Sequence, residues 1–192
     1  MTAAPAAPPH AAPWHHLCVS IINYRTGALT IACVQSVLAD LDGRDALVAV
    51  VDNASGDGSA EEIEAWIAAQ DPPVPVRLIR SATNSGFSGG HNQGIAAAEA
   101  AFYLILNSDA VLRPGFFATI LAAAEAHPET GLFSPRLTYD DGEVQRSSFR
   151  FHSPLGELIR TARTNAVTTL FARHEVALPP EPEPTQIEWA SF

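Results

Sequence analysis

The sequence predicts an α/β fold with a mainly parallel sheet and helices on both faces. Short runs rich in Val and Ile are continuous rather than alternating, which is typical of strands buried on both faces. Segments with apolar residues at helical spacing separate these runs. Strands that alternate with helices in this way favour a parallel sheet covered by helices.

The expected elements follow one another along the chain. The first four alternate strand and helix, over residues 18–24, 26–41, 46–53 and 59–70. The next four continue the alternation, over residues 76–80, 89–101, 102–106 and 114–126. Ser59 is the expected N-cap of the second helix, and Pro114 suits the first turn of the fourth.

The pattern changes after Gly131. Residues 132–139 and 143–151 flank the turn sequence Asp140-Asp141-Gly142, which predicts an antiparallel hairpin. A helix is expected over 155–171, a linker at 179–184 and one more strand at 185–192. The sequence therefore predicts a parallel sheet followed by a smaller antiparallel element.

Composition excludes several classes of partner. The formal net charge is -10 and no lysine is present, so the basic surface that nucleic acids and anionic membranes need is missing. The two cysteines, Cys18 and Cys33, fall inside predicted elements, where we expect inert core thiols in a reducing compartment. No basic leader and no run of about 20 apolar residues is found. These features predict a cytoplasmic protein.

Three apolar strands end in polar or acidic residues. These residues are Asn23 and Tyr24, Asp52 and Asn53, and Asn107 with Asp109. The carboxyl ends of parallel strands meet at one edge of a sheet, where open α/β folds bind ligands. Asn and Asp also begin turns after strands, but three coincidences favour a binding crevice.

A glycine-rich segment at 82–95 is a second candidate part of a ligand site. Its glycines allow the backbone to approach a ligand at the start of a helix, where N–H groups can bind phosphate. The segment matches neither the P-loop nor the dinucleotide fingerprint. Phe87 within it can pack beneath the loop or against a base, of which packing is favoured. His91 can lie at the surface or touch a phosphate, of which the surface is favoured.

Four segments in this order, SIINY, VVDNASGDGS, TNSGFSGGHNQGI and LILNSDA, resemble glycosyltransferase family 2, especially its bacterial rhamnosyltransferase-like branch. The resemblance covers residues 17–151, and RLTYDDGEVQRSSFRF also resembles a segment that follows in such enzymes. It implies a GT-A-type (Rossmann-like) fold and inverting transfer of a sugar from a nucleotide diphosphate donor.

The resemblance also implies roles for residues at the sheet edge. Asn23 and Tyr24 would line the base pocket, Asp52 would hydrogen-bond uracil or thymine, and Asn84 and Gly86 would border the donor. Asp109, the last acid of the family's Asp-x-Asp motif, would hold Mg²⁺ or Mn²⁺ on the diphosphate. The first position of that motif is Asn107 here, which would meet the ribose or a metal-bound water.

The general base of the inverting reaction is not identified, so no catalytic residue is assigned. In the family it lies beyond a Trp-containing strand that the final residues of this chain begin. The predicted organisation is a disordered lead at 1–16, a nucleotide-sugar-binding domain at 17–151, and a partial acceptor-side region at 152–192 that ends abruptly.

The leading hypothesis is a glycosyltransferase of the hexosyltransferase type. It would transfer the sugar of a UDP- or dTDP-sugar to a glycan or lipid-linked acceptor. Rhamnosyl transfer in cell-envelope polysaccharide synthesis is one form of this reaction. The expected location is cytoplasmic, with peripheral contact at the inner face of a membrane, where lipid-linked acceptors lie, as the alternative. The alternative is a truncated, catalytically incomplete nucleotide-sugar-binding module. A nucleotidyltransferase ranks third, because the basic glycine-rich loop of such enzymes is missing near residues 23–27.

Overall fold

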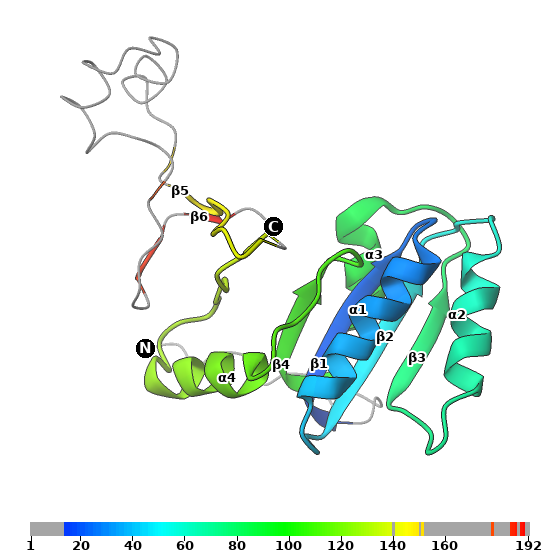
Figure 1. Ribbon diagram of the computed structural model, residues 1–192, viewed down its shortest axis with the longest axis horizontal. Helices are drawn as coiled ribbons and strands as arrows, with labels where there is room; N and C mark the ends of the chain where they lie inside the picture. Colours follow the sequence, from blue (N-terminus) through cyan, green and yellow to red (C-terminus); the bar gives the residue numbers. More distant parts are fainter. Residues whose placement is uncertain are drawn as a thin grey trace, which may run out of the picture. The chain divides into compact units, whose positions relative to one another are not determined.

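The chain divides into two compact units, Met1–Phe117 and Ala118–Phe192. The computed structural model describes residues 14–139, 141–149, 151, 178, 185–187 and 189–190 (Figure 1). The predicted helix at 155–171 and linker at 179–184 lie outside these residues.

The first unit is built on a four-stranded parallel sheet with strand order β3-β2-β1-β4. Its strands are β1 (Trp14–Asn23), β2 (Ala46–Asp52), β3 (Val76–Arg80) and β4 (Glu99–Leu106). The order reverses at β1, because the chain adds β2 and β3 on one side of β1 and then crosses to add β4 on the other. Open α/β sheets bind ligands at such a switch point.

Helices cover both faces of this sheet, as the sequence predicts (Figure 1). They are α1 (Gly27–Asp40), α2 (Ser59–Ala68) and α3 (Gly86–Ile95). Helices α1 and α2 pack on one face, where Gly27 of α1 lies against Ser59 of α2. Helix α3 packs on the opposite face against alternate residues of β1 and β2, including Ser20 and Val51.

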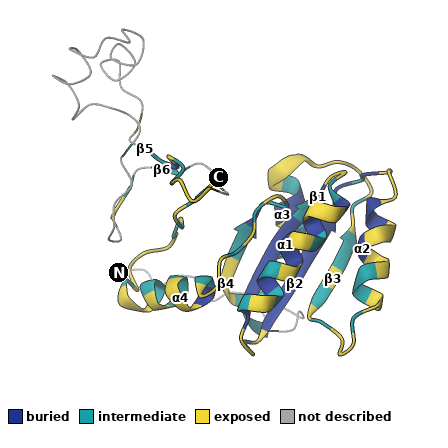
Figure 2. Ribbon diagram, viewed as in Figure 1, coloured by how far each residue is buried: buried dark blue, intermediate teal, exposed yellow. Residues whose placement is uncertain are grey.

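The core lies on the two central strands (Figure 2). Every residue of β2 is buried, and Val19 and Ile21 of β1 have no exposed surface. Strand β4 differs from the prediction of a strand buried on both faces: Phe102 and Tyr103 are 37% and 43% exposed, and only Leu106 is buried. The physical reason is its position, since β4 pairs with β1 alone and forms an edge of the sheet within the described residues.

Helix α3 begins at Gly86, three residues before the predicted start, and contains four glycines. Glycine is a poor helix former, so packing rather than propensity stabilises this helix. A Cβ atom on Gly90 would lie 2.8 Å from Ile22 Cδ1, and one on Gly94 would overlap the Ser20 hydroxyl. These two glycines allow α3 to lie directly on β1.

Gly94→Ala is expected to destabilise the protein by about 1–2 kcal/mol, because the overlap with Ser20 outweighs the gain in helix propensity. Urea unfolding measures this change. The matched control is Gly131→Ala, where the added Cβ meets nothing within 4 Å. A Gly94→Ala variant as stable as the wild type would show that α3 does not depend on this close approach.

Helix α4 (Phe116–Ala126) starts two residues after Pro114, so the predicted place of Pro114 in its first turn is wrong. A carboxylate distant in sequence caps this helix. Asp40, the last residue of α1, accepts hydrogen bonds from the N–H groups of Gly115 and Phe117. This cap joins the end of α1 to the start of α4.

The N-cap of α2 is Gly58, with φ at 91°, and not Ser59 as predicted. The Asp57 carboxylate accepts both the N–H and the hydroxyl of Ser59, at 3.0 and 2.6 Å. These hydrogen bonds to Ser59 lower the pKa of Asp57. Because the Ser59 hydroxyl donates its hydrogen to Asp57, its oxygen can accept a hydrogen bond from Asn23, which belongs to the site described below.

The second unit contains a small antiparallel sheet of β5 (Ser148–Phe149) and β6 (Trp189–Ala190). The predicted final strand is therefore present, but it pairs with β5. The predicted hairpin is present as a short turn, with an antiparallel bridge between Thr138 and Val144 and backbone hydrogen bonds from Tyr139 to Glu143 and from Gln145 to Leu137. Its second flank continues into β5, which pairs with β6 instead of the first flank.

The start of β1 also differs from the sequence expectation. Strand β1 begins at Trp14, so His15 and His16 belong to the sheet rather than to a lead. His15 Nδ1 lies 2.8 Å from Asp45 Oδ1, which lowers the pKa of that carboxyl. Over the described parts of the chain, we find no helix with both the length and the apolar character needed to cross a membrane.

Candidate functional site

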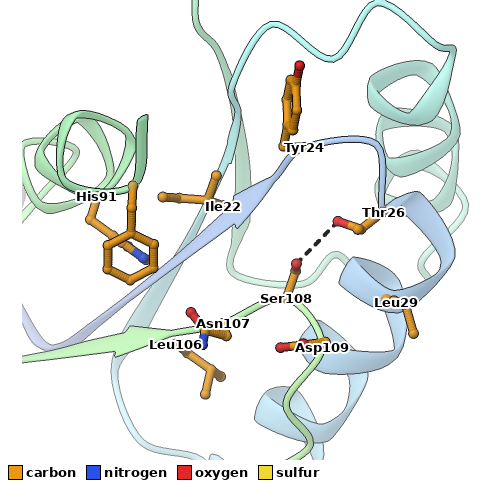
Figure 3. A pocket seen from close by; sticks show the side chains of 10 residues that line it. Ile22, Tyr24, Thr26, Leu29, His91, Leu106, Asn107, Ser108 and Asp109 are labelled. Carbon is orange, nitrogen blue, oxygen red and sulfur yellow. Dashed lines mark hydrogen bonds between the residues drawn. The ribbon is translucent and has the colours of Figure 1, made fainter. Parts of the chain in front are cut away.

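A pocket of about 300 Å³ lies at the carboxyl ends of β1 and β4, at the point where the strand order reverses (Figure 3). Two half-exposed aromatic rings, Tyr24 and Phe87, are among its lining residues. The other lining residues are Ile22, Thr26, Leu29, His91, Leu106, Asn107, Ser108 and Asp109. The pocket thus combines apolar and aromatic surface with one carboxylate, as ligand sites commonly do.

A buried polar network around Asn23 supports the β1 end of this pocket. The Asn23 side chain has no exposed surface. Its Nδ2 lies within hydrogen-bonding distance of three acceptors: Asp52 Oδ1 (2.8 Å), Ser59 Oγ (2.8 Å) and Ser55 Oγ (3.2 Å). Its Oδ1 accepts from the Thr26 N–H and from the hydroxyls of Thr26 and Thr30. One amide therefore ties together the ends of β1 and β2 and the starts of α1 and α2.

The residues after Asn23 form a turn that presents Tyr24. Arg25 adopts a left-handed conformation with φ at 62°. Its Nε donates to the Ser55 carbonyl at 3.2 Å, and its guanidinium lies 5.2 Å from the centre of the Tyr24 ring. This contact fixes an aromatic ring at the mouth of the pocket, with a positive charge beside it.

Asn53 connects the end of β2 to the glycine segment. Its Nδ2 donates to Asn84 Oδ1 at 3.0 Å and to the Gly86 carbonyl at 3.2 Å. Its Oδ1 accepts from the Ser85 N–H at 2.9 Å. Asn84 Oδ1 in turn accepts the Gly86 N–H at 2.9 Å. This network sets the start of α3, which explains why the helix begins earlier than the sequence predicts.

The segment Asn107-Ser108-Asp109 turns away from the end of β4 and forms one wall of the pocket. The hydroxyls of Ser108 and Thr26 lie 3.2 Å apart, which links this turn to the loop after β1 (Figure 3). The Asn107 carbonyl accepts from the Ala110 N–H at 3.1 Å and from the Cys33 thiol at 3.4 Å. The backbone is therefore held from both sides, and the Asp109 side chain is left exposed.

Asp109 fits the divalent metal that the resemblance implies. No cluster of three His, Cys, Asp or Glu side chains able to hold a metal occurs among the described residues. Mg²⁺ needs no such cluster, because it is commonly bound by one or two carboxylates together with substrate phosphates and water. Burial, with a smaller effect of Asp109, raises the pKa of Cys33 to about 12, so this nearby thiol stays protonated at neutral pH.

The predicted site residues fall into three groups. Tyr24, Asn107 and Asp109 line the pocket. Asn23 and Asp52 lie in the buried network, with 0% and 6% exposure, so Asn23 has no surface to offer a ligand directly. Asn84 and Gly86 lie at the start of α3, where Asn53 binds them. The three strand ends thus meet at one edge, but only two of them contribute side chains to the pocket itself.

Several pocket residues were not expected from the sequence. Thr26 and Ser108 adjoin predicted site residues, and their hydroxyls could have been found from that proximity. His91 was expected at the surface but is 4% exposed, since the absence of side chains at Gly90 and Gly94 brings α3 onto β1. Phe87 packs edge-on against His91, with ring centres 4.4 Å apart, yet is 49% exposed.

Both cysteines are free and buried, as expected of core thiols. Burial raises the pKa of Cys18, with a smaller opposing effect of Arg77. The Cys18 thiol donates to the Gly94 carbonyl at 3.7 Å. Neither thiol is therefore suited to nucleophilic chemistry.

Comparison with known proteins relates this fold and site to a family. The curated succinoglycan biosynthesis protein ExoO of Rhizobium meliloti (strain 1021) is 31% identical over 106 residues, which cover 55% of this chain and 29% of that protein. The crystal structure of S. aureus TarS 1-349 superposes with a TM-score of 0.51 at 17% identity, over 71% of this chain and 41% of that one. The chain thus spans less than half the length of either protein.

The TarS likeness supports the fold alone, and it agrees with the predicted GT-A-type arrangement of a parallel sheet between helices. A family model described as Glycosyl transferase family 2 matches residues 18–177, which include β2, β3, β4, all but the first four residues of β1, and the whole pocket. The chain belongs to glycosyltransferase family 2.

Proposed function

We propose that this chain is the donor-binding part of an inverting glycosyltransferase that uses a UDP- or dTDP-sugar. The observation that carries this proposal is the pocket at the switch point of the sheet, where Tyr24, Asn107 and Asp109 converge from two strand ends. Its volume of about 300 Å³ is at the lower end of the range for small-molecule sites. Family membership supports the same assignment.

The nucleoside is assigned to the β1 side of the pocket. Tyr24 presents a half-exposed ring on which a pyrimidine can stack, and Arg25 fixes the orientation of that ring. Asp52 is proposed to hydrogen-bond the pyrimidine and Asn84 to border the nucleoside. Gly86, with φ at 70°, brings the backbone close to the donor without a side chain in between. Asn23 contributes indirectly, because its hydrogen bonds hold the loops after β1 and β2 in place.

The diphosphate is assigned to the Asp109 side. Asp109 is the residue proposed to hold Mg²⁺ or Mn²⁺, with Asn107 as a neutral hydrogen-bonding partner for the ribose or for water. When bound, such an ion stabilises the charge that develops on the leaving diphosphate. A chain with a formal net charge of -10 repels a diphosphate at long range. A divalent cation at the site would therefore be needed to offset the negative charge of the diphosphate.

The acceptor is proposed to be a glycan or a lipid-linked saccharide. The name of the relative from Rhizobium meliloti, a succinoglycan biosynthesis protein, supports a polysaccharide context. Rhamnosyl transfer in cell-envelope synthesis is the specific form we propose, from the rhamnosyltransferase-like motifs. The protein would work on the cytoplasmic side, where nucleotide sugars are made, with peripheral contact to a membrane that carries the acceptor.

A panel of nucleotides tested by thermal unfolding with Mg²⁺ examines this proposal. UDP- and dTDP-sugars at about 100 times their Kd are expected to stabilise the protein by about 2.7 kcal/mol, which corresponds to roughly 5–11 °C in Tm for a chain of this size. ADP- and GDP-sugars serve as controls and should give smaller shifts. Equal shifts for purine and pyrimidine donors, or none at all, would contradict the assignment.

The same panel separates an enzyme from a binding module. Release of UDP or dTDP from a stabilising donor in the presence of acceptor saccharides is expected of the enzyme. The alternative predicted from the sequence, a module that binds the donor without transferring the sugar, gives the thermal shift without release of the nucleotide.

A further inference from the structure

His91 has a buried imidazole ring whose Nε2 has no hydrogen-bond partner among the described residues. The residue lies on α3, is 4% exposed and lines the pocket (Figure 3). Its Nδ1 lies 2.9 Å from Ser20 Oγ. Its Nε2 is the one buried side-chain nitrogen or oxygen without a hydrogen bond in the described part of the chain. Buried polar groups without partners are rare and costly, so this nitrogen calls for an explanation.

The hydrogen bond to Ser20 favours the tautomer in which Nε2 carries the ring proton and is a donor. Within the described residues, the Ser20 hydroxyl has Nδ1 as its hydrogen-bond partner. A hydroxyl hydrogen needs an acceptor, and Nδ1 can accept only if the ring proton is on Nε2. Burial lowers the pKa of His91, so the ring is neutral at pH 7 and carries a single proton. The imidazole therefore offers an uncharged N–H donor.

The surroundings of the ring select the kind of acceptor that this N–H can meet. Four apolar side chains, Ile22, Leu29, Phe87 and Leu106, line the same pocket, and Asp109 is its one acidic residue. Figure 3 shows His91 on the opposite side of the pocket from Thr26 and Leu29. A neutral donor among apolar groups suits an uncharged oxygen, such as a carbonyl or a hydroxyl, better than a phosphate.

Phe87 packs directly on the His91 ring and lines the same pocket. The Phe87 ring packs edge-on against the imidazole, at 4.4 Å between ring centres and an interplanar angle of 71°. Phe87 is also 49% exposed and stands in the first turn of α3. Exposed side chains change rotamer on the picosecond to nanosecond timescale, so rotation of this ring can open the path from the pocket to Nε2.

We infer that His91 determines donor specificity: its Nε2–H donates a hydrogen bond to an uncharged oxygen of the nucleotide sugar when Phe87 rotates aside. Ser20 is the positioning residue, because it fixes the ring and its tautomer through Nδ1. The inference rests on the proposed function of the pocket. A donor oxygen bound at Nε2 would satisfy this buried nitrogen. Gly90 and Gly94 allow α3 to lie on β1, which holds the His91 ring in position for that hydrogen bond.

Two substitutions that mimic different halves of the imidazole test the inference. In His91→Asn the amide oxygen can replace Nδ1 as the acceptor of the Ser20 hydroxyl, but no donor reaches the position of Nε2, whereas in His91→Gln the amide nitrogen reaches it. Calorimetry with Mg²⁺ and UDP, and then with UDP-sugars, is performed on the full chain. His91→Asn is expected to weaken binding roughly three- to tenfold, the order for one neutral hydrogen bond, while His91→Gln stays within about twofold of the wild type.

The two ligands locate the oxygen that His91 binds. A loss already seen with UDP assigns it to the nucleoside, and a loss seen only with UDP-sugars assigns it to the sugar. ¹⁵N spectra of the histidine rings supply an independent readout, in which we expect an Nε2–H tautomer for His91 and a shift of that resonance when the ligand is added.

Contrary outcomes separate this inference from the function on which it rests. Wild-type protein that binds neither UDP nor UDP-sugars contradicts the proposed function, and the role of His91 fails with it. Wild-type binding that His91→Asn leaves unchanged, in a variant with the same Tm, overturns the inference alone. An Nδ1–H tautomer that ligand addition does not change overturns it as well.

Discussion

Asp109→Ala is expected to abolish the metal-dependent binding of UDP and UDP-sugars. Asp109 is the one acidic side chain in the pocket lining, and the buried Cys33 thiol beside it is protonated at neutral pH. Removing the carboxylate leaves no anionic ligand in the pocket for Mg²⁺ or Mn²⁺. We expect a loss of affinity of roughly a hundredfold or more, which corresponds to the several kcal/mol that a divalent ion contributes at such sites.

Calorimetry with and without EDTA measures this effect. For the wild type, EDTA should weaken binding strongly, and for Asp109→Ala it should change little, because the metal contribution is already lost. Glu125→Ala is the matched control, since it removes one exposed carboxylate from α4, outside the pocket. Metal-dependent binding by Asp109→Ala at wild-type strength would remove the metal assignment.

Asn23→Ala is expected to have the largest effect on stability. The side chain is fully buried and has hydrogen-bond partners on both its nitrogen and its oxygen. Its loss leaves the buried Asp52 carboxylate without the amide donor 2.8 Å away and opens a cavity at the end of β1. We expect destabilisation of about 3 kcal/mol, or roughly 6–12 °C in Tm.

Urea unfolding followed by circular dichroism tests this expectation. Asn92→Ala is the matched control, because Asn92 is an exposed asparagine on α3 and its loss should cost much less. An Asn23→Ala variant as stable as the control would mean that the network does not hold the ends of β1 and β2 together. Weaker binding of UDP with unchanged stability would instead favour direct contact between Asn23 and the donor.

The sequence was most informative about the central strands. Residues 46–51 are apolar without alternation, and all of β2 is buried. The strand predicted at 76–80 matches β3 at both ends. The prediction for β2 succeeds because a strand covered by helices on both faces must be largely apolar, a condition that residues 46–51 satisfy throughout and residues 18–22 satisfy except at Ser20.

Other features depend on contacts between residues distant in sequence, which no local pattern contains. Helix α3 begins at Gly86 because Asn53 and Asn84 bind the backbone there. His91 is buried because α3 has no side chain at Gly90 or Gly94 to separate it from β1. Strand β4 has an apolar sequence but exposed rings, since the apolar pattern does not say which strand lies at the edge.

Only part of the site could be predicted, because some of its features depend on topology and others on contacts between residues distant in sequence. The strand ends converge as parallel topology requires, so Tyr24, Asn107 and Asp109 meet in one pocket. The sequence does not reveal that Asn23 turns inward and Tyr24 outward. Asn23 ends β1 facing α1 and α2, where Thr30 and Ser59 bind it, whereas Tyr24 lies beyond the strand in the turn that Arg25 forms with φ at 62°.

A crystal structure of this protein with UDP and Mn²⁺, in which the anomalous signal locates the ion, tests the assignment of the donor site. We expect a manganese peak at coordination distance from the Asp109 carboxylate, the pyrimidine beside Tyr24, and the diphosphate between the manganese and the pyrimidine. UDP bound away from the pocket at the ends of β1 and β4, or manganese bound without Asp109, would contradict that assignment.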